Sequence, residues 1–255
     1  MITRSPFDAA LLRVPSGRTS APPPGGQDAP AWRRVARTLL QTGVRHSPLA
    51  SHLLWRLPEG AAGVALTFDD GPDPQHTPRI LDILQEAGAK ATFFLVGRAV
   101  IRCPDLVRRI VAEGHAVGNH TFSHVPLRRL GTSALAEELA KTDRILAELG
   151  VPSLPPVRPP WGSISPGQVL HLARANRRII LWSADARDYR AASDEAVAGW
   201  GGRLQPRDIL LLHDRFPATV AALPRLLRAL RERGLTAVSL EGAKRHCPGR
   251  AGEGA

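Results

Sequence analysis

Two adjacent carboxylates, Asp69 and Asp70, directly follow the apolar run of residues 64–68 and are stopped by Gly71-Pro72. Acids side by side at the end of a buried strand repel each other and lose hydration energy. Such a pair therefore usually persists where a cation binds one acid and chemistry uses the other. The tight turn that Gly71 and Pro72 impose would aim both acids at the mouth of the strand.

The missing ligands for such a cation are supplied by His120 and His124, which stand at positions i and i+4. A helical turn or a compact loop could direct both imidazoles at one ion. A pair of histidines alone is more often incidental. With Asp70 it becomes a 2-His-1-carboxylate set, which leaves coordination positions open for water and substrate and suits zinc or another divalent first-row metal.

Three further motifs could serve the same site. Arg158 precedes the rigid turn 159–162, although alone it would be taken for one more surface arginine. The polar segment 185–189 follows an apolar run and could equally be a solvated loop. His213 ends the apolar run 209–212, where a histidine could also be a hydrogen-bonded core residue. The remaining histidines have no comparable setting.

The segments that must position these residues alternate between two hydrophobic patterns, one typical of strands and one typical of helices. Apolar runs typical of buried strands are separated by segments with helical spacing. Strands are expected at 64–68, 91–96, 115–118, near 157, and at 179–182, 209–212 and 235–238, with helices at about 80–87, 106–114, 132–149, 166–176, 193–203 and 217–233. This alternation predicts a parallel α/β sheet, closed or open. The polar motifs follow strand ends, which form the catalytic face of a β/α barrel.

Taken together, the motifs resemble those of polysaccharide deacetylases of carbohydrate esterase family 4, the NodB-homology domain. They lie in the family's order at 67–70, 120–124, 158–161, 185–189 and 211–213. The resemblance covers about residues 60–241, and the ordered set is far more specific than any one motif. It implies a single-domain, distorted (β/α)7-8 barrel, in agreement with the strand and helix pattern.

The resemblance also assigns roles, residue by residue. It implies that Asp70, His120 and His124 bind the metal, while Asp69 stays free as the general base. The metal's charge and Arg158 would keep Asp69 ionised, ready to take a proton from the metal-bound water. The hydroxide so formed would attack an acetamide carbonyl.

The same resemblance implies the general acid and the substrate contacts. His213 would protonate the departing sugar amine, and Asp188 would pair with His213 and raise its pKa into a useful range. The metal and the backbone N–H of Trp161 would stabilise the oxyanion. Leu211 would line a small pocket for the acetyl methyl. The substrate-binding residues implied in this way are Pro160, Trp161, Tyr189 and Leu211.

Two positions depart from the family pattern. Tyr189 stands where the fourth motif usually ends in Trp, which leaves the shape of the acetate-side wall open, and its hydroxyl needs a partner. Trp161 stands where Tyr is commoner, but its implied role uses the backbone. Neither change touches the reaction itself.

We therefore expect a metal-dependent hydrolase that removes N-acetyl groups from GlcNAc-containing glycans such as peptidoglycan or chitin-type oligomers. One divalent metal is expected, Zn²⁺ first, with Co²⁺ or Mn²⁺ as alternatives. The same attack would serve an O-acetyl ester such as acetyl-xylan. A third alternative is an inactive carbohydrate- or wall-binding domain, although the base, the acid and all the implied ligands are present.

Composition agrees with one domain and limits the partners. The 255 residues are enough for one sizeable core, and single α/β barrels commonly have this length. The net charge of +11 comes mainly from arginines scattered along the chain, and aromatic residues make up only 5%. A nucleic-acid groove is therefore not expected. No apolar run approaches the roughly 18 to 20 residues of a membrane span, and a monomer is expected.

The ends of the chain are expected to lie outside the main domain. The first residues form no convincing signal peptide, so a cytoplasmic location is one expectation and an exported, wall-associated protein is the other. Cys103 and Cys247 are expected to be free thiols. The expected segments are a disordered leader at 1–30, a weakly helical packing extension at 31–59 and a flexible tail at 242–255.

Overall fold

The structure is a computed structural model that describes residues 52–61, 63–191 and 193–242. The expected leader, the first part of the expected extension, the tail from 243 onwards and Cys247 lie outside the described residues. The strands are β1 (Leu53–Leu54), β2 (Val64–Asp69), β3 (Thr92–Leu95), β4 (Ala116–Asn119), β5 (Ile179–Ile180), β6 (Ala184–Asp185), β7 (Ile209–His213) and β8 (Ala237–Val238). The helices are α2 (Thr77–Glu86), α3 (Gly97–Arg102), α4 (Pro104–Ala112), α5 (Thr132–Glu148), α6 (Pro166–Arg174), α7 (Asp194–Ala198) and α8 (Pro217–Glu232). Short 3-10 turns are η4 (Leu127–Arg129), η5 (Pro160–Gly162), η6 (Asp188–Arg190) and η7 (Gly199–Gly202).

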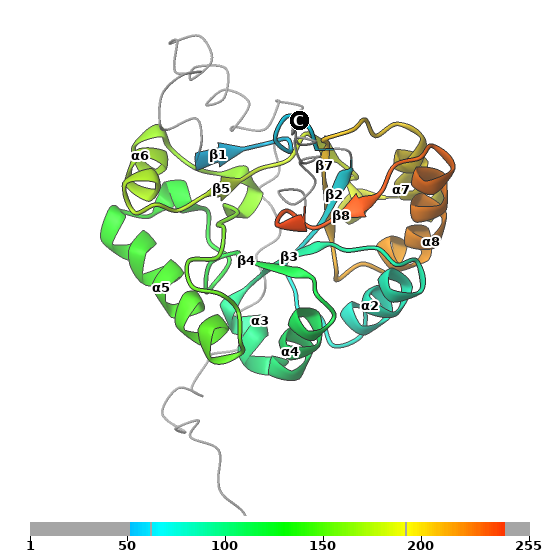
Figure 1. Ribbon diagram of the computed structural model, residues 1–255. Helices are drawn as coiled ribbons and strands as arrows, with labels where there is room; N and C mark the ends of the chain where they lie inside the picture. The colour runs from blue at the N-terminus through cyan, green and yellow to red at the C-terminus, as the bar shows by residue number, and fades with distance from the viewer. Residues whose placement is uncertain (1–51, 62, 192, 243–255) are drawn as a thin grey trace, which may run out of the picture.

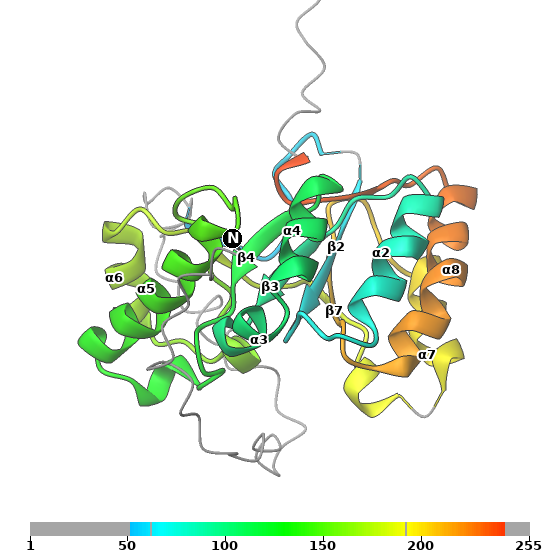
Figure 2. The same cartoon turned by 90° about the horizontal axis from the view of Figure 1, so that it is seen from below.

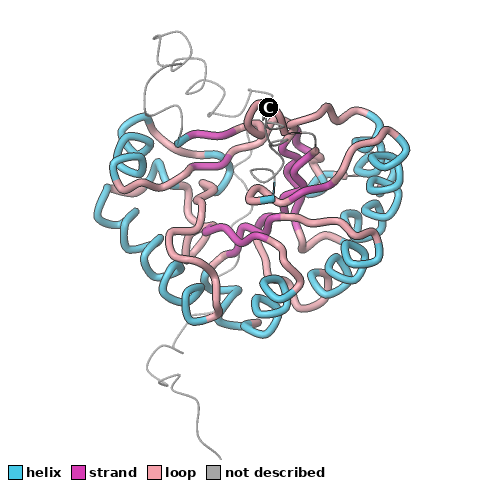
Figure 3. The backbone as a smooth tube through the Cα atoms, viewed as in Figure 1, coloured by secondary structure: helices cyan, strands magenta, loops and turns pink. Residues whose placement is uncertain are grey.

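Parallel strands form a ring at the centre of the molecule. β4, β3, β2, β7 and β6 pair side by side in that order, β8 pairs with the start of β2, and β1 pairs with β5. Val157 bridges Asn119 of β4 to Ile179 of β5. Because β5 and β6 belong to one segment, 179–185, these pairings close the sheet on itself (Figure 3). The expected distorted (β/α) barrel is confirmed.

Helices cover the outside of this ring. Figure 1 looks into the barrel and shows the helices arranged around the strands, while Figure 2 shows α2 and α8 alongside β2 and β7. The residues at the helix N-termini favour helix formation. α2 and α8 carry a proline in their first turn, and Ser165 and Gln168 form a capping box on α6. Within the described residues, no helix is both long and apolar enough to span a lipid bilayer.

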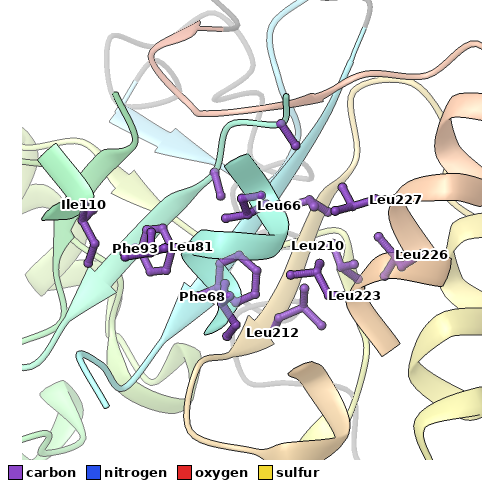
Figure 4. Close-up of a cluster of buried hydrophobic side chains, with 14 of the residues drawn as sticks. Leu66, Phe68, Leu81, Phe93, Ile110, Leu210, Leu212, Leu223, Leu226 and Leu227 are labelled. Atoms are coloured by element: carbon purple, nitrogen blue, oxygen red, sulfur yellow. The ribbon is translucent and has the colours of Figure 1, made fainter. Parts of the chain in front are cut away.

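Side chains along β2 and β7 point alternately to the two faces of the sheet, and they contribute to a different apolar core on each face. The even-numbered residues of both strands pack outwards against the helices, where Leu66, Phe68, Leu210 and Leu212 meet the leucines of α8 (Figure 4). The odd-numbered residues face the barrel interior: Ala65, Ile209 and Leu211 belong to the inner core. Because side chains alternate across a strand, Thr67, Asp69 and His213 also lie on the inner face.

Several elements differ from the sequence-based expectation. A single bridging residue, Val157, replaces the strand expected there, and β6 and α3 are additional to the expected elements. The helix expected over 193–203 ends as an α-helix at Ala198, because the glycine-rich stretch 199–202 continues as a 3-10 turn. Residues 53 and 54, in a segment expected to be weakly helical, form β1 instead.

Candidate active site

The polar motifs meet at the carboxyl ends of the strands. Asp69 ends β2 and Asp70 follows it, His120 follows β4, and His213 ends β7. In the pairing of β2 with β7, Asp69 stands opposite His213. Parallel strands bring their carboxyl ends to one rim of a barrel, so residues far apart in the chain share one mouth.

Asp70, His120 and His124 offer ligand atoms that all lie within 4.8 Å of one another. Asp70 Oδ1 lies 3.5 Å from His120 Nε2 and 3.0 Å from His124 Nε2. Burial opposes the charged form of Asp70, but its contacts with the two imidazoles outweigh burial and hold its pKa well below its usual range. The fold therefore brings together the residues that the sequence pointed to as metal ligands.

The chemistry of this donor set fits a cation. His120 Nδ1 lies 2.8 Å from the carbonyl oxygen of Arg158 and donates its proton there, so Nε2 is the ring nitrogen left to bind a cation beside Asp70. Asp70 Oδ1 is buried and has no hydrogen-bond partner among the described residues. Two electron-pair donors that face each other in a buried place are stabilised by a positive ion between them.

The loop that carries the two histidines is fixed by hydrogen bonds between its backbone and nearby side chains. Asn119 accepts a hydrogen bond from the N–H of Thr121, and the Thr121 hydroxyl accepts one from the N–H of His124. Glu138 of α5 accepts the N–H groups of residues 122 and 123. Thr121 and His124 both have positive φ, at 67° and 54°. Strained residues of this kind persist where the surroundings fix them, as at binding sites.

The turn after Asp70 is shaped by a close approach to the loop that follows β7. Asp70 has a φ of 77°. A Cβ on Gly71 would overlap the carboxylate of Asp214, so only glycine fits there. Asp214 is fully buried and accepts a hydrogen bond of 2.6 Å from the Thr77 hydroxyl. Burial raises the pKa of Asp214 to about 7, against the lowering effect of that hydrogen bond, with the charges of Asp70 and Asp73 adding to the rise.

Arg158 lies completely buried inside the barrel, which overturns its reading as a surface arginine. Its Nη1 donates to Asp69 Oδ1 at 2.8 Å and to the Thr67 hydroxyl at 2.7 Å. Its other nitrogens donate to backbone carbonyls of the β5–β6 segment, and its guanidinium lies 4.1 Å from the ring centre of Phe94. Asp69 is thus fixed by one oxygen, while Oδ2 faces His120 Nε2 at 3.7 Å.

His213 is held by the buried carboxylate of Asp188. Its Nδ1 lies 2.7 Å from Asp188 Oδ1, and its backbone N–H donates to Oδ2. Thr219 and the N–H of Tyr189 donate to the same carboxylate, so Asp188 is fully satisfied. Burial lowers the pKa of His213, but the hydrogen bond and charge of Asp188, with Asp70 and Asp69 further off, outweigh it and raise the pKa to about 9.

The substrate-side residues line the mouth around these groups. Trp161 has a φ of 55°, and its ring lies 4.3 Å from that of His124. Within the described residues, the backbone N–H of Trp161 donates no hydrogen bond, so this donor is available. Tyr189 is exposed and its ring meets His213 edge-on at 5.4 Å. Its hydroxyl finds a partner in Asp185 at 3.3 Å, and Pro160 and Leu211 are buried.

Two residues at the mouth were missed by sequence reasoning. Arg215 Nη1 lies 3.5 Å from Asp70 Oδ2. The ring of Phe216 meets His213 edge-on at 5.7 Å, on a T-shaped geometry like that of Tyr189. Both follow the motif that contains His213, but nothing in an arginine-rich sequence distinguishes this arginine from the others.

Known proteins match this chain in both sequence and structure. The sequence model of the polysaccharide deacetylase family matches residues 57–179. A peptidoglycan-N-acetylglucosamine deacetylase of Bacillus cereus is 36% identical over 72% of this chain and 68% of its own length. A chitooligosaccharide deacetylase of Sinorhizobium fredii is 38% identical over 71% of this chain and 91% of its own.

Among solved structures, a peptidoglycan N-acetylglucosamine deacetylase bound to an N-hydroxybenzamide superposes with a TM-score of 0.70. It is 35% identical, and the match covers 74% of this chain and 91% of that one. Identity, coverage and fold agree, and the matched segment includes the Asp-Asp, histidine and arginine motifs described above. The chain therefore belongs to the polysaccharide deacetylase family.

Proposed function

We propose that this protein removes N-acetyl groups from glycans that contain N-acetylglucosamine, with the aid of one divalent metal. One observation carries the proposal: a 2-His-1-carboxylate set lies beside an uncoordinated carboxylate and opposite a histidine held by a buried aspartate. These are the ligands, the base and the acid that amide hydrolysis needs. The names of the relatives, which act on peptidoglycan and chitooligosaccharides, support the same substrate class.

The residues divide the chemistry between them. A cation bound by Asp70, His120 and His124 supplies Lewis-acid chemistry to a water molecule and to the acetamide carbonyl. Asp69, fixed by Arg158, accepts the proton that the attacking water loses. The N–H of Trp161 donates to the carbonyl oxygen as that oxygen gains charge.

His213 completes the reaction on the opposite side of the mouth. The pKa of about 9 keeps it protonated near neutral pH, so it can donate that proton to the amide nitrogen. The C–N bond then breaks, and the products are acetate and a free sugar amine. Zn²⁺ is the metal we favour, since two imidazoles and one carboxylate suit it, and Co²⁺ or Mn²⁺ could take the same place.

The proposal is tested by acetate release from metal-loaded protein with N-acetylated chito-oligomers and peptidoglycan. Asp69→Asn should lower kcat by about 10² to 10⁴-fold, the usual range for loss of a general base. The matched control is Asp105→Asn, an exposed aspartate on α4 whose one ion pair within the described residues is with Arg108. Metal content measured in parallel should stay at wild-type level in Asp69→Asn and fall in Asp70→Asn.

Two outcomes decide against the proposal. Release of acetate from O-acetylated xylan alone would replace the N-deacetylase with an ester hydrolase, since the same residues serve both bonds. Absence of acetate from every acetylated glycan at full metal occupancy would leave a binding domain without catalysis.

A further inference from the structure

Three exposed arginines flank the general acid at the mouth of the barrel. Arg187 and Arg190 lie in the loop that supplies Asp188, and Arg215 lies two residues after His213. No catalytic step uses any of them. We refer to Arg187, Arg190 and Arg215 as the arginine rim.

Aromatic rings lie between His213 and two of the rim arginines, Arg190 and Arg215. The guanidinium carbon of Arg190 lies 5.8 Å from the ring centre of Tyr189, and that of Arg215 lies 5.8 Å from the ring centre of Phe216. Both rings meet His213 edge-on. The charges of Arg190 and Arg215 therefore each lie next to a ring that contacts His213, the residue proposed to protonate the departing sugar amine.

The carboxylates near the rim are already engaged. Asp188 accepts hydrogen bonds from His213 and Thr219, and Asp185 accepts them from the backbone N–H of Arg187 and from Tyr189. In the described part of the chain, Arg187 and Arg190 form no ion pair. Two of the three rim arginines, Arg187 and Arg190, therefore carry positive charge that no ion pair in the described residues offsets, whereas Arg215 lies 3.5 Å from Asp70.

We propose that the arginine rim recognises a carboxylate on the sugar next to the reacting N-acetyl residue, so that an anionic glycan is preferred to a neutral one. The proposal rests on the proposed function and narrows its substrate class. Guanidinium groups pair with carboxylates through two parallel hydrogen bonds, which favours arginine over other cations for this task. Because the rim is exposed, each pair contributes modestly and is weakened by salt.

The test compares two forms of one glycan. The first consists of peptide-free strands in which N-acetylglucosamine alternates with lactyl-bearing N-acetylmuramic acid, whose carboxylates are free. The second is the same material with those carboxylates converted to methylamides. Wild-type protein should show a KM several-fold lower on the anionic strands, and raising the ionic strength from about 0.05 to 0.5 M should remove most of the difference.

The variant for this test is Arg187→Gln/Arg190→Gln. It should raise KM on the anionic strands by about fivefold, the effect of losing exposed ion pairs, and leave KM on the methylamide strands unchanged. The matched control is Arg228→Gln/Arg231→Gln, which removes two exposed arginines near the C-terminal end of α8. That end leads to β8, which pairs with the start of β2, so it lies at the opposite end of the barrel.

Arg215 is tested separately because it also contacts Asp70. Arg215→Gln should raise KM on the anionic strands while metal content stays at the wild-type level. The proposal is overturned if wild type treats both strands alike, or if the double variant and its control change KM equally. These outcomes presuppose measurable deacetylation, so they are distinct from failure of the proposed function.

Discussion

Two histidines at opposite ends of the barrel, the partly buried His213 and the buried His115, have opposite electrostatic settings. His213 follows the carboxyl end of β7 and has a pKa raised to about 9. His115 precedes the amino end of β4, and its side chain is 1% exposed. Burial, helped by the charge of Lys90, lowers the pKa of His115 to about 4. Burial alone therefore does not decide the charge of a histidine in this fold.

The difference lies in the acid beside each ring. Asp188 is itself buried and lies 2.7 Å from Nδ1 of His213. Glu113 stays 3.7 Å from Nε2 of His115, too far for a hydrogen bond, while Nδ1 of His115 accepts the N–H of Ala91. The structure therefore favours the protonated form of His213 and the neutral form of His115, which packs against Phe93.

The largest expected difference between the two histidines is in catalytic activity. His213→Asn should lower kcat by about 10² to 10⁴-fold because the leaving amine loses its proton donor. The matched change His115→Asn keeps an acceptor for the Ala91 N–H and should leave kcat within about twofold, as it lies far from the chemistry. Acetate release at constant metal occupancy measures both. Equal losses in the two variants would contradict the assignment of the acid.

The pH dependence of kcat tests the role of Asp188. His213 must be protonated to act, so wild-type kcat should be retained below pH 9 and lost as the pH rises through about 9. In Asp188→Asn the raising charge is gone and burial lowers the pKa, so the alkaline limb should move down by about one unit or more. Glu113→Gln should leave the limb in place. An unmoved limb in Asp188→Asn would show that another group is titrating.

The two histidines should also have opposite effects on stability. His115 has a folded pKa of about 4, below its unfolded value, so the unfolded state binds the extra proton and stability is lost as the pH falls from about 6.5 to 4. The loss is on the order of 2 to 3 kcal/mol. Denaturant unfolding of His115→Asn should show a flatter acid slope, despite some lost packing.

His213 affects the pH dependence of stability in the opposite direction. Its folded pKa of about 9 exceeds the unfolded value, so its contribution to stability is complete below about pH 6.5 and is lost as the pH rises through about 9. His213→Asn should therefore flatten the alkaline slope and leave the acid slope alone. The same slopes in both variants would contradict the assignment of opposite settings.

Much of the fold could be predicted because it depends on local patterns. The apolar runs at 64–68 and 209–212 become β2 and β7, and the helical spacing of 132–149 becomes α5. Two of the missed elements, β1 and β6, span only two residues each, so their periods are too short to recognise, and tertiary pairing alone defines them.

The site shows the same division. The Asp-Asp and histidine motifs could be recognised as one candidate site from residue types and spacing, because polar residues that follow parallel strands meet at one rim of a barrel. The setting of Arg158 could not, since its burial depends on Asp69, Thr67 and Phe94, which lie far away in the chain. Arg215 gave no signal for a similar reason: its contact with Asp70 exists only after β2 and β7 pair.

The sequence by itself determined which reactive groups this protein has and in what order they follow its strands. That information is local, because alternation and motif spacing are properties of neighbouring residues. Only the tertiary structure decided the protonation of His213 and His115, which arginines are buried and which arginines lie at the mouth of the barrel. Those properties depend on distances between separate segments, and charge interactions change strongly over a few ångströms of distance and burial.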